Sequence, residues 1–461
     1  MAFFLVISGL PIHTANAAAY DPVTKTEDDA TLDLRFWEDQ KPDVGFYLNA
    51  GNRFLLETVT EPWFGTSAGE WSVMDILRGY YTGYDYLNYV PDNYYEDYIK
   101  RVEGYVIAKK GELDRSKSTE WSRSTLSLSA LGKDIRNVGE PGDYLNVKFV
   151  TMYQGEKEVN TSNSLNYFTI KLDGDTVVLD QEYGLEFNYV SQKSGKNATG
   201  FAIVPPGTYT IDRTNMQLRN EKNEVVSVPY TEMNFGKPVT THTVDTLAAA
   251  SILTLEKPYD YVEKLSKQYS FTYRQGINGP IWILIAMDTG GYELYTKEQL
   301  AERGITVTDA TITTKGKLID YILGKEITST TGRVGGWALT GKNADPDISM
   351  MAVQSLAPYY LDEQKFKNAY RTTLDTSTNT YFDVDSDSFK EKYTEFKKAV
   401  ERAVYVMAED QKPNGGFASF GTINSESIVQ VIVGLTALGI DPLSNSVHLP
   451  TIDQTVSFIK E

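Results

Sequence analysis

The pattern of apolar and polar positions predicts two kinds of helical segment, which alternate along the chain. The first kind has one charged face and one apolar face, and it covers Tyr94–Lys110, Tyr259–Tyr269, Lys315–Glu326 and Phe389–Gln411. Each precedes a segment of the second kind, which carries few charges over three turns. A helix with so few charges is expected to be buried on most of its faces, whereas the amphipathic one needs a wet face. The alternation predicts hairpins with a polar outer helix and an apolar inner helix.

The apolar segment recurs five times. The copies are GEWSVMDILRGYYTG (Gly69–Gly83), TEWSRSTLSLSALGKD (Thr119–Asp134), NGPIWILIAMDTGG (Asn278–Gly291), GGWALTGKNADPDISMMAVQSLAPYY (Gly335–Tyr360) and NSESIVQVIVGLTALGID (Asn424–Asp441). In the fourth copy, Pro346 is pre-set for the first helical turn, and Asp345 and Asp347 complement the positive end of the helix dipole. A repeated helical unit predicts a repeat architecture. Two concentric layers of such hairpins would form an α/α toroid, and an open α-solenoid would use the same hairpins.

Period-two alternation interrupts this rhythm from about Glu140 to Thr254. The strand-like runs are Val147–Tyr153, Tyr167–Leu172, Thr176–Leu179, Leu185–Val190 and Gly207–Ile211. Asp173-Gly174 stands between two of them as a hairpin turn. Short strands at short spacing predict an inserted β-sandwich. The segment Val244–Leu255 fits a helix and a strand equally.

These patterns predict a mainly α fold, an α/α toroid of helical hairpins with an inserted β-sandwich domain. The toroid would occupy residues 43–139 and 255–461, and the insertion residues 140–254. Thr451–Glu461 predicts one more outer helix without an inner partner, so the ring would be incomplete.

The first 42 residues are predicted to comprise a targeting segment and a linker that precede the fold. Phe3–Ile7 is a short apolar run and Ala15-Asn16-Ala17 a small-residue cleavage site, so residues 1–20 indicate a signal peptide. Residues 21–42 form a polar N-terminal segment. No later segment is long and apolar enough to span a bilayer, so we expect no transmembrane anchor in this chain.

The composition excludes several kinds of chemistry. The 461 residues include no cysteine, which rules out disulfides, Cys-ligated zinc and a thiol nucleophile. An exported chain without cysteine fits a secreted or cell-surface protein of a Gram-positive bacterium. The net charge of −18 disfavours nucleic acid as a partner. The only histidines are His13, His242 and His448, which disfavours a His-dependent triad and leaves no zinc site.

Two turns carry a family resemblance. They are KEITSTTGRVGGWAL (Lys325–Leu339) and AEDQKPNGGFASFGTINSES (Ala408–Ser427), in which a polar segment precedes Gly-Gly-aromatic. With these turns and the repeated helices, the chain resembles the terpenoid cyclase/protein prenyltransferase superfamily. It looks most like the prenyltransferase- and squalene-cyclase-like repeats of Gram-positive surface proteins, over residues 44–139 and 257–461. The resemblance implies an α/α toroid but does not fix an activity.

The resemblance allows three activities to be tested against the residues. Protein prenyltransferases hold zinc with Asp, Cys and His, and complement-type thioester domains need a Cys, so both are excluded here. Class II terpene cyclases protonate an alkene or epoxide with the middle Asp of an Asp-x-Asp-Asp motif. The matching run is Asp345-Pro346-Asp347-Ile348, which implies Asp347 as general acid with Asp345 assisting. Ile348 departs from the motif, which puts this activity in doubt.

Such an acid needs a dry cavity in which aromatic rings stabilise the cation. Four tryptophans at or near inner-helix starts are candidates for that wall: Trp71, Trp121, Trp282 and Trp337. Acids also begin other repeated units, at Glu70, Glu120 and Glu426. That recurrence favours helix capping over catalysis for Asp345 and Asp347.

Transcobalamin and intrinsic factor, which this chain resembles in expected fold, bind ligands outside cells without catalysis. We therefore predict an exported, cell-surface ligand- or protein-binding protein without enzymatic activity. Its partner would be a small molecule, a glycan or a surface protein. The candidate lining residues are Trp71, Glu120, Trp121, Trp282, Trp337, Asp345, Asp347, Glu426 and Gln430.

Two smaller patterns leave alternatives open. Asp383, Asp385 and Asp387 alternate as in the first half of a calcium loop, but Ser388 stands where that loop has glycine, so a solvated helix N-cap is the other interpretation. No other cofactor is predicted. The segment Tyr80–Tyr105 is rich in tyrosine, which suits sugar stacking. A glycan-binding or glycan-active protein, with paired carboxylates, is thus a third hypothesis, and tyrosine packing between hairpins is its alternative.

Overall fold

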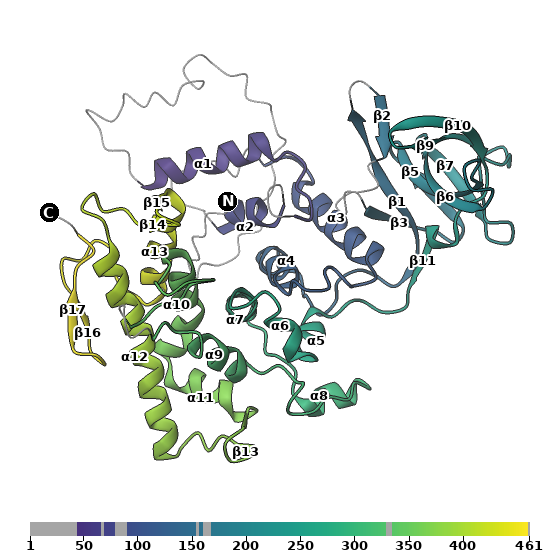
Figure 1. Ribbon diagram of the computed structural model, residues 1–461. Coiled ribbons are helices and arrows are strands. Elements are labelled where there is room, and N and C mark those ends of the chain that lie inside the picture. Colours follow the sequence, from purple (N-terminus) through teal and green to yellow (C-terminus); the bar gives the residue numbers. More distant parts are fainter. Residues whose placement is uncertain are drawn as a thin grey trace.

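The computed structural model describes residues 44–65, 69–78, 90–153, 156–159, 167–328 and 334–459. The predicted signal peptide at 1–20 and polar segment at 21–42 lie outside the described residues. The described chain has a helical part and a β part, which lie side by side (Figure 1).

The five repeated units form five helices that pack next to one another in chain order. They are α2 (Glu70–Arg78), α4 (Thr119–Ala130), α7 (Asn278–Gly290), α10 (Pro346–Leu361) and α13 (Ser425–Ala437). Each contacts the next in the row. Their apolar side chains share one hydrophobic core, to which α7 contributes almost its whole length. The row forms because a helix without a charged face must be covered by neighbours on several sides.

Helices of varied length, most of them more polar, flank this row. They are α1 (Val44–Thr58), α3 (Tyr94–Ala108), α5 (Tyr261–Ser266), α6 (Tyr269–Thr272), α8 (Lys297–Glu302), α9 (Lys315–Leu323), α11 (Glu363–Arg371) and α12 (Asp387–Asp410). All of them except α8 place side chains in the core or against it. Tyr98 of α3, for example, is fully buried, and its hydroxyl lies 2.7 Å from Ser127 Oγ of α4.

The helices α10 and α13 approach each other unusually closely at Gly434. A Cβ atom on Gly434 would lie 3.0 Å from both Cβ and the carbonyl oxygen of Met350. Such distances are shorter than ordinary carbon contacts, so only glycine lets the two backbones come this near. The contact fixes the spacing of the last two helices of the row.

The β part lies between α4 and α5 in the chain and is antiparallel throughout. Its largest sheet has the order β11-β1-β5-β6, with β2 and β3 also pairing with β1. These strands are β1 (Gly142–Tyr153), β2 (Glu156–Val159), β3 (Tyr167–Lys171), β5 (Tyr183–Val190), β6 (Asn197–Val204) and β11 (Ile252–Leu255). A three-stranded sheet, order β4-β7-β8, and the hairpin β9–β10 complete it. Their bounds are β4 (Thr176–Leu179), β7 (Gly207–Asp212), β8 (Gln217–Arg219), β9 (Val228–Asn234) and β10 (Lys237–Val244). These strands enclose a hydrophobic cluster of their own.

The two parts meet where α3 packs on β3. Gly104 faces Phe168, whose ring fills the space that a side chain on Gly104 would need. Thr169 Oγ1 donates a 3.2 Å hydrogen bond to the carbonyl oxygen of Gly104. The ring of Trp63 contacts Phe149 edge to face, with centroids 4.6 Å apart. This apolar contact holds the β part against the helices.

The predicted fold class, a mainly α toroid, is wrong. In the described residues the chain has 13 helices, with 39% of residues helical and 22% in strands, so the protein is mixed α and β. The periodicity of the repeated units reports only on the helices. It does not register the antiparallel sheets or the small hairpins between helices.

The predicted outer helix at Thr451–Glu461 is also wrong. Within this segment Gln454–Val456 forms β17, which pairs with the preceding strand β16 (Val447–Leu449), while residues 460 and 461 lie outside the described residues. Glu401 of α12 explains the difference, because its buried carboxylate accepts hydrogen bonds from the backbone N–H groups of Thr451 and Ile452. The undecided segment Val244–Leu255 ends β10, makes a short 3-10 turn at Ala249–Ser251 and then forms β11. Within the described residues, no helix has the length and apolar character needed to cross a membrane.

Candidate functional site

A cleft of 840 Å³ opens where the first turn of α10 meets a small hairpin. The hairpin consists of β14 (Ala418–Ser419) and β15 (Thr422–Ile423), and it leads directly into α13. The other walls are the loop 338–344 and the end of α12. Four charged side chains line the cleft together with the apolar side chains of Leu339, Met351 and Phe420; the charged ones belong to Asp345, Asp347, Asp410 and Lys412.

The Gly-Gly-Trp turn positions the start of α10. Gly336 has a φ of 73°, and a Cβ on it would lie 2.7 Å from Cβ of Ala344, so the turn requires glycine there. Trp337 is fully buried, and its indole N–H donates a 2.7 Å hydrogen bond to the carbonyl oxygen of Ile322. The carbonyl oxygen of Trp337 accepts a 2.8 Å hydrogen bond from the backbone N–H of Asp345. The loop is thereby anchored at both ends, and Asp345 comes to stand at the helix start.

Asp345 is the N-cap of α10. Its Oδ1 accepts a 3.1 Å hydrogen bond from the backbone N–H of Ile348, as expected for a capping acid. Its Oδ2 accepts a 2.6 Å hydrogen bond from Ser419 Oγ of β14. Both oxygens are therefore engaged, and Asp345 ties the hairpin to the helix.

Asp347 is placed differently, although it lies only two residues further on. Its side chain is half-buried, and its Oδ1 is buried without a hydrogen-bond partner among the described residues. Burial raises the pKa of this carboxyl, and the neighbouring Asp345 and Glu426 raise it further. The nearby hydroxyls of Ser427 and Ser419 oppose the increase. Asp347 is thus a carboxylate whose charged form is incompletely stabilised by the protein.

The first two helices of the row show the opposite arrangement. Glu70 of α2 is fully buried, and its Oε2 lies 3.1 Å from Arg123 Nε. A terminal nitrogen of the Arg123 guanidinium lies 2.5 Å from Oε2 of Glu120. One arginine therefore neutralises two carboxylates there, whereas no ion pair between described residues involves Asp345, Asp347 or Glu426. The three acids at the starts of α10 and α13 therefore have no ion pair among the described residues.

The nine residues predicted to line one mouth are dispersed. Asp345 and Asp347 line the cleft, and Glu426 lies close enough to affect the pKa of Asp347. Gln430 lies deeper between α10 and α13, where its Nε2 donates a 3.3 Å hydrogen bond to Oε1 of Gln354. Glu120 belongs to the Arg123 cluster.

The four tryptophans do not gather around the cleft either. The rings of Trp71 and Trp282 lie 5.5 Å apart, between α2 and α7. Trp121 is buried against Phe271, with ring centroids 5.3 Å apart. Trp337 lies in the core, and Phe420, which is 90% exposed, is the only aromatic side chain that lines the cleft among the described residues. This open cleft lacks the dry aromatic wall that the cyclase hypothesis requires.

The remaining predicted residues find structural roles. Asp385 pairs with Lys367 and Asp387 with Lys390, while Asp383 accepts a hydrogen bond from the backbone of Asp385. No group of three or more His, Asp or Glu residues able to hold a metal ion occurs in the described chain, so these acids do not form the hypothesised calcium site.

The tyrosine-rich segment falls partly outside the described residues. Of the tyrosines that are described, Tyr94, Tyr98 and Tyr105 are buried in the core. The Tyr94 hydroxyl donates a 2.8 Å hydrogen bond to the carbonyl oxygen of Val59. These side chains therefore provide no surface on which a sugar could stack.

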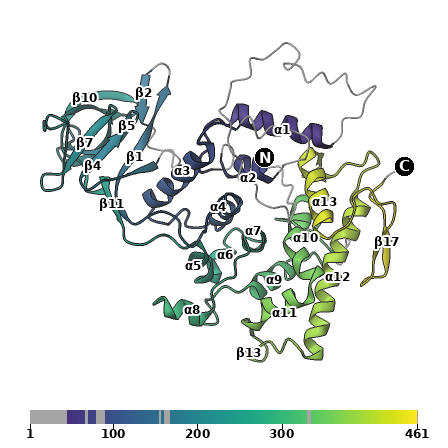
Figure 2. The same ribbon diagram turned by 180° about the vertical axis from the view of Figure 1, so that it is seen from behind.

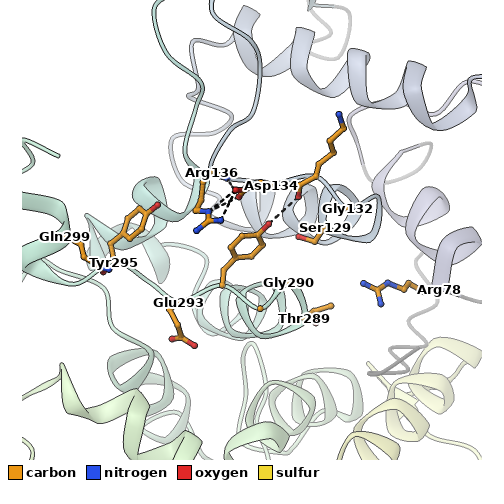
Figure 3. A pocket seen from close by; sticks show the side chains of 13 residues that line it. Arg78, Ser129, Gly132, Asp134, Arg136, Thr289, Gly290, Glu293, Tyr295 and Gln299 are labelled. Carbon is orange, nitrogen blue, oxygen red and sulfur yellow. Dashed lines mark hydrogen bonds and ion pairs between the residues drawn. The ribbon is translucent and has the colours of Figure 1, made fainter. Parts of the chain in front are cut away.

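A second cavity, of 660 Å³, lies at the C-terminal ends of α2, α4 and α7 (Figure 3). Arg136 and Asp134 form a bidentate ion pair in it, and Arg78 points into it from the end of α2. Lys315 pairs with Glu293 at 2.8 Å. Because most of its charges are already neutralised by partners, this cavity offers a ligand less than the cleft does.

Sequence reasoning identified Asp345 and Asp347 but missed Ser419, Phe420 and Ser427. All three belong to the turn quoted above for the family resemblance, so a signal existed. It did not show that the hairpin folds back onto α10. Comparison with known proteins adds no guide, since no protein-family model, no curated protein and no solved structure matches this chain.

Proposed function

We propose that this protein is a non-enzymatic binding protein whose cleft receives a positively charged group of its ligand. The observation that carries the proposal is Asp347, a half-buried carboxylate that lines an open cleft, has one buried oxygen without a hydrogen-bond partner and has no ion pair among the described residues. A bound cation would favour the charged form of Asp347 and supply what Arg123 supplies to Glu70 and Glu120.

The cleft also defines the kind of cation. Leu339, Met351 and Phe420 provide apolar surface beside the carboxylates. A lysine or arginine side chain combines a long apolar stem with a charged end, and it matches such a lining. The ligand class that fits best is therefore a protein or peptide segment with an accessible basic residue.

Export to the cell surface remains part of this proposal. It is supported by the signal-peptide pattern of residues 1–20 and by the absence of cysteine. The relation of the repeated units to squalene-cyclase-like repeats also stays a prediction, supported by the two Gly-Gly-aromatic turns. No contact in the described structure favours the cyclase or glycan hypotheses.

The test is a titration with a fluorescein-labelled peptide that carries one lysine between two leucines. The same peptide with its lysine acetylated is the ligand control. Asp347→Asn should weaken binding of the lysine peptide about tenfold, because it removes a charge-assisted contact. The matched protein control is Asp383→Asn, since Asp383 is exposed and does not line the cleft. Equal affinity for the two peptides would refute the proposal.

The pH dependence gives a second readout. Because burial holds the pKa of Asp347 above its ordinary value, the carboxyl takes up a proton at a higher pH than an exposed aspartate. The lysine peptide should therefore bind less tightly as the pH falls, and the loss should begin at a higher pH than an exposed aspartate would give. In Asp347→Asn this pH dependence should be largely lost.

A further inference from the structure

Two hairpins of this protein turn on the same dipeptide, Phe-Gly. At the tip of β9–β10, Phe235 has a φ of 48° and Gly236 a φ of 76°. At the tip of β14–β15, Phe420 and Gly421 have φ values of 50° and 82°. Positive φ at both central residues is the geometry of a type I′ turn, which favours Asn-Gly and disfavours a bulky first residue. A phenylalanine at this position is therefore not explained by the turn.

Phe235 is almost completely exposed. Its relative accessibility is 97%, the highest among the exposed large hydrophobic side chains of the described residues. Met233 and Val239 on the same hairpin are exposed as well, and so is Val190 at the end of β5. The strands β5 and β6 form the neighbouring hairpin, and β6 contacts β9. The two hairpin tips thus lie side by side, and each carries exposed apolar side chains.

Three lysines surround this surface. Lys193 donates a 2.7 Å hydrogen bond from Nζ to Asn234 Oδ1, and its Nζ lies 5.3 Å from the ring centre of Phe235. Lys196 stands at the same turn as Lys193, and Lys237 follows Gly236 directly. No ion pair between described residues involves any of these lysines.

The segments Val190–Lys196 and Met233–Val239 contain no acid, and Glu232, which directly precedes Met233, does not pair with these lysines. Glu232 lies on β9 and is held by other groups: Ser191 Oγ donates to its Oε1 and His242 Nε2 lies 3.0 Å from its Oε2. The tips therefore form a local cationic surface on a chain whose net charge is −18. They also lie at the end of the β part away from the helical row in both views (Figures 1 and 2).

We propose that these tips, Val190–Lys196 and Met233–Val239, dock onto a membrane surface rich in anionic lipid. Phe235 would enter the boundary between headgroups and acyl chains, where aromatic rings are favoured. Lys193, Lys196 and Lys237 would interact with the lipid phosphates. A protruding aromatic ring with lysines beside it suits an anionic membrane. The ring can insert below the headgroups, and the lysines can interact with the negative charge of the lipid surface. The cleft lies in the other part of the protein and would remain open.

The experiment is co-sedimentation of the full chain with vesicles of phosphatidylcholine alone or mixed with phosphatidylglycerol. The chain should sediment with the mixed vesicles and not with the neutral ones. Phe235→Asn should lose most of the binding while keeping the fold, since Asn-Gly is the preferred sequence for this turn. Phe235→Leu keeps an apolar tip and should retain most of the binding. Lys237→Gln should reduce partitioning about fivefold.

Phe420→Asn is the matched control, because it makes the same change at the other Phe-Gly turn and should leave vesicle binding unchanged. Thermal unfolding of Phe235→Asn at or above the wild-type temperature shows that the variant is folded. The proposal is overturned if the wild-type chain does not sediment with the mixed vesicles, or if Phe235→Asn binds them as well as the wild type. Inorganic polyphosphate serves as a probe for charge alone. If the wild type and Phe235→Asn bind polyphosphate equally and also bind vesicles equally, the site recognises only negative charge, and the proposal is overturned.

Discussion

Ser419 Oγ donates a 2.6 Å hydrogen bond to Oδ2 of Asp345, and this bond joins the hairpin β14–β15 to the first turn of α10. The other oxygen of the same carboxylate caps the helix. One side chain thus sets the start of α10 and the position of the hairpin that carries Phe420. The geometry of the cleft depends on this single carboxylate.

Asp345→Ala should lower the stability of the helical part by about 1–2 kcal/mol, because the cap and the bond to Ser419 are both lost. Asp345→Asn should cost less, since asparagine also caps helices well. Urea unfolding followed by far-UV circular dichroism measures both. If Asp345→Ala has the stability of the wild type, the carboxylate does not hold the helix start as described.

Asp75 of α2 gives a prediction with a defined pH dependence. Burial raises its pKa to about 8, and it has no hydrogen bond or ion pair within the described chain. Between pH 4 and pH 8 the unfolded chain has released this proton while the folded chain still holds it, so the contribution of Asp75 to stability falls as the pH rises. Asp75→Asn should therefore raise the melting temperature at pH 7.5 more than at pH 4.5. A uniform shift at both pH values would contradict the assignment.

Arg123 tests the buried acidic cluster at the start of α2 and α4. Arg123→Met leaves Glu70 and Glu120 without their common cation in a buried site, which should cost about 3–5 kcal/mol. Adding Glu70→Gln to Arg123→Met should recover part of the loss, because the fully buried uncompensated charge is then removed. Chemical unfolding of the single and double variants measures the coupling. If the stability losses of Arg123→Met and Glu70→Gln add up to the loss of the double variant, the two charges do not interact.

Glu401 tests the attachment of the last hairpin. Its carboxylate accepts hydrogen bonds from the Tyr360 hydroxyl, from Thr451 N and Oγ1, and from Ile452 N. In Glu401→Gln an amide NH₂ must face groups that donate, so we expect a loss of about 1–3 kcal/mol. Amide hydrogen exchange should accelerate at Thr451 and Ile452. The control is Glu391→Gln, on a different face of α12, where no such set of donors is present among the described residues; unchanged exchange in Glu401→Gln would contradict the role given to Glu401.

The helices of the repeated units could be predicted because their signal is local. Apolar runs behind Glu70, Pro346 or Ser425 have to form buried helices, and the structure confirms them. Strands with one buried face, such as β1 and β5, were also recognisable from alternation. The strand β10 was missed because neither of its faces is consistently buried, so its sequence lacks the pattern.

The fold class and the site could not be predicted for a different reason. Both depend on contacts between segments far apart in the chain. Asp347 and Asp345 were found because they stand at a recognisable helix start. That Ser419 and Phe420 would lie against them follows from the packing of α13 on α10, for which the sequence shows only a glycine in a helix. The nine residues predicted to line one binding site are dispersed, because the N-termini of neighbouring helices in the row face different surroundings.

That glycine, Gly434, links the geometry of the cleft to a contact in the core. It lies seven residues after Ser427, about 10 Å along α13, and it sets how closely α13 approaches Met350. A larger residue at position 434 would push α13 away from Met350 of α10 at this point. The helix α13 would then tilt, and Ser427 and Phe420 would move relative to Asp347. Substitutions in the core between α10 and α13 would thereby change the shape of the cleft while every residue of its lining stays the same.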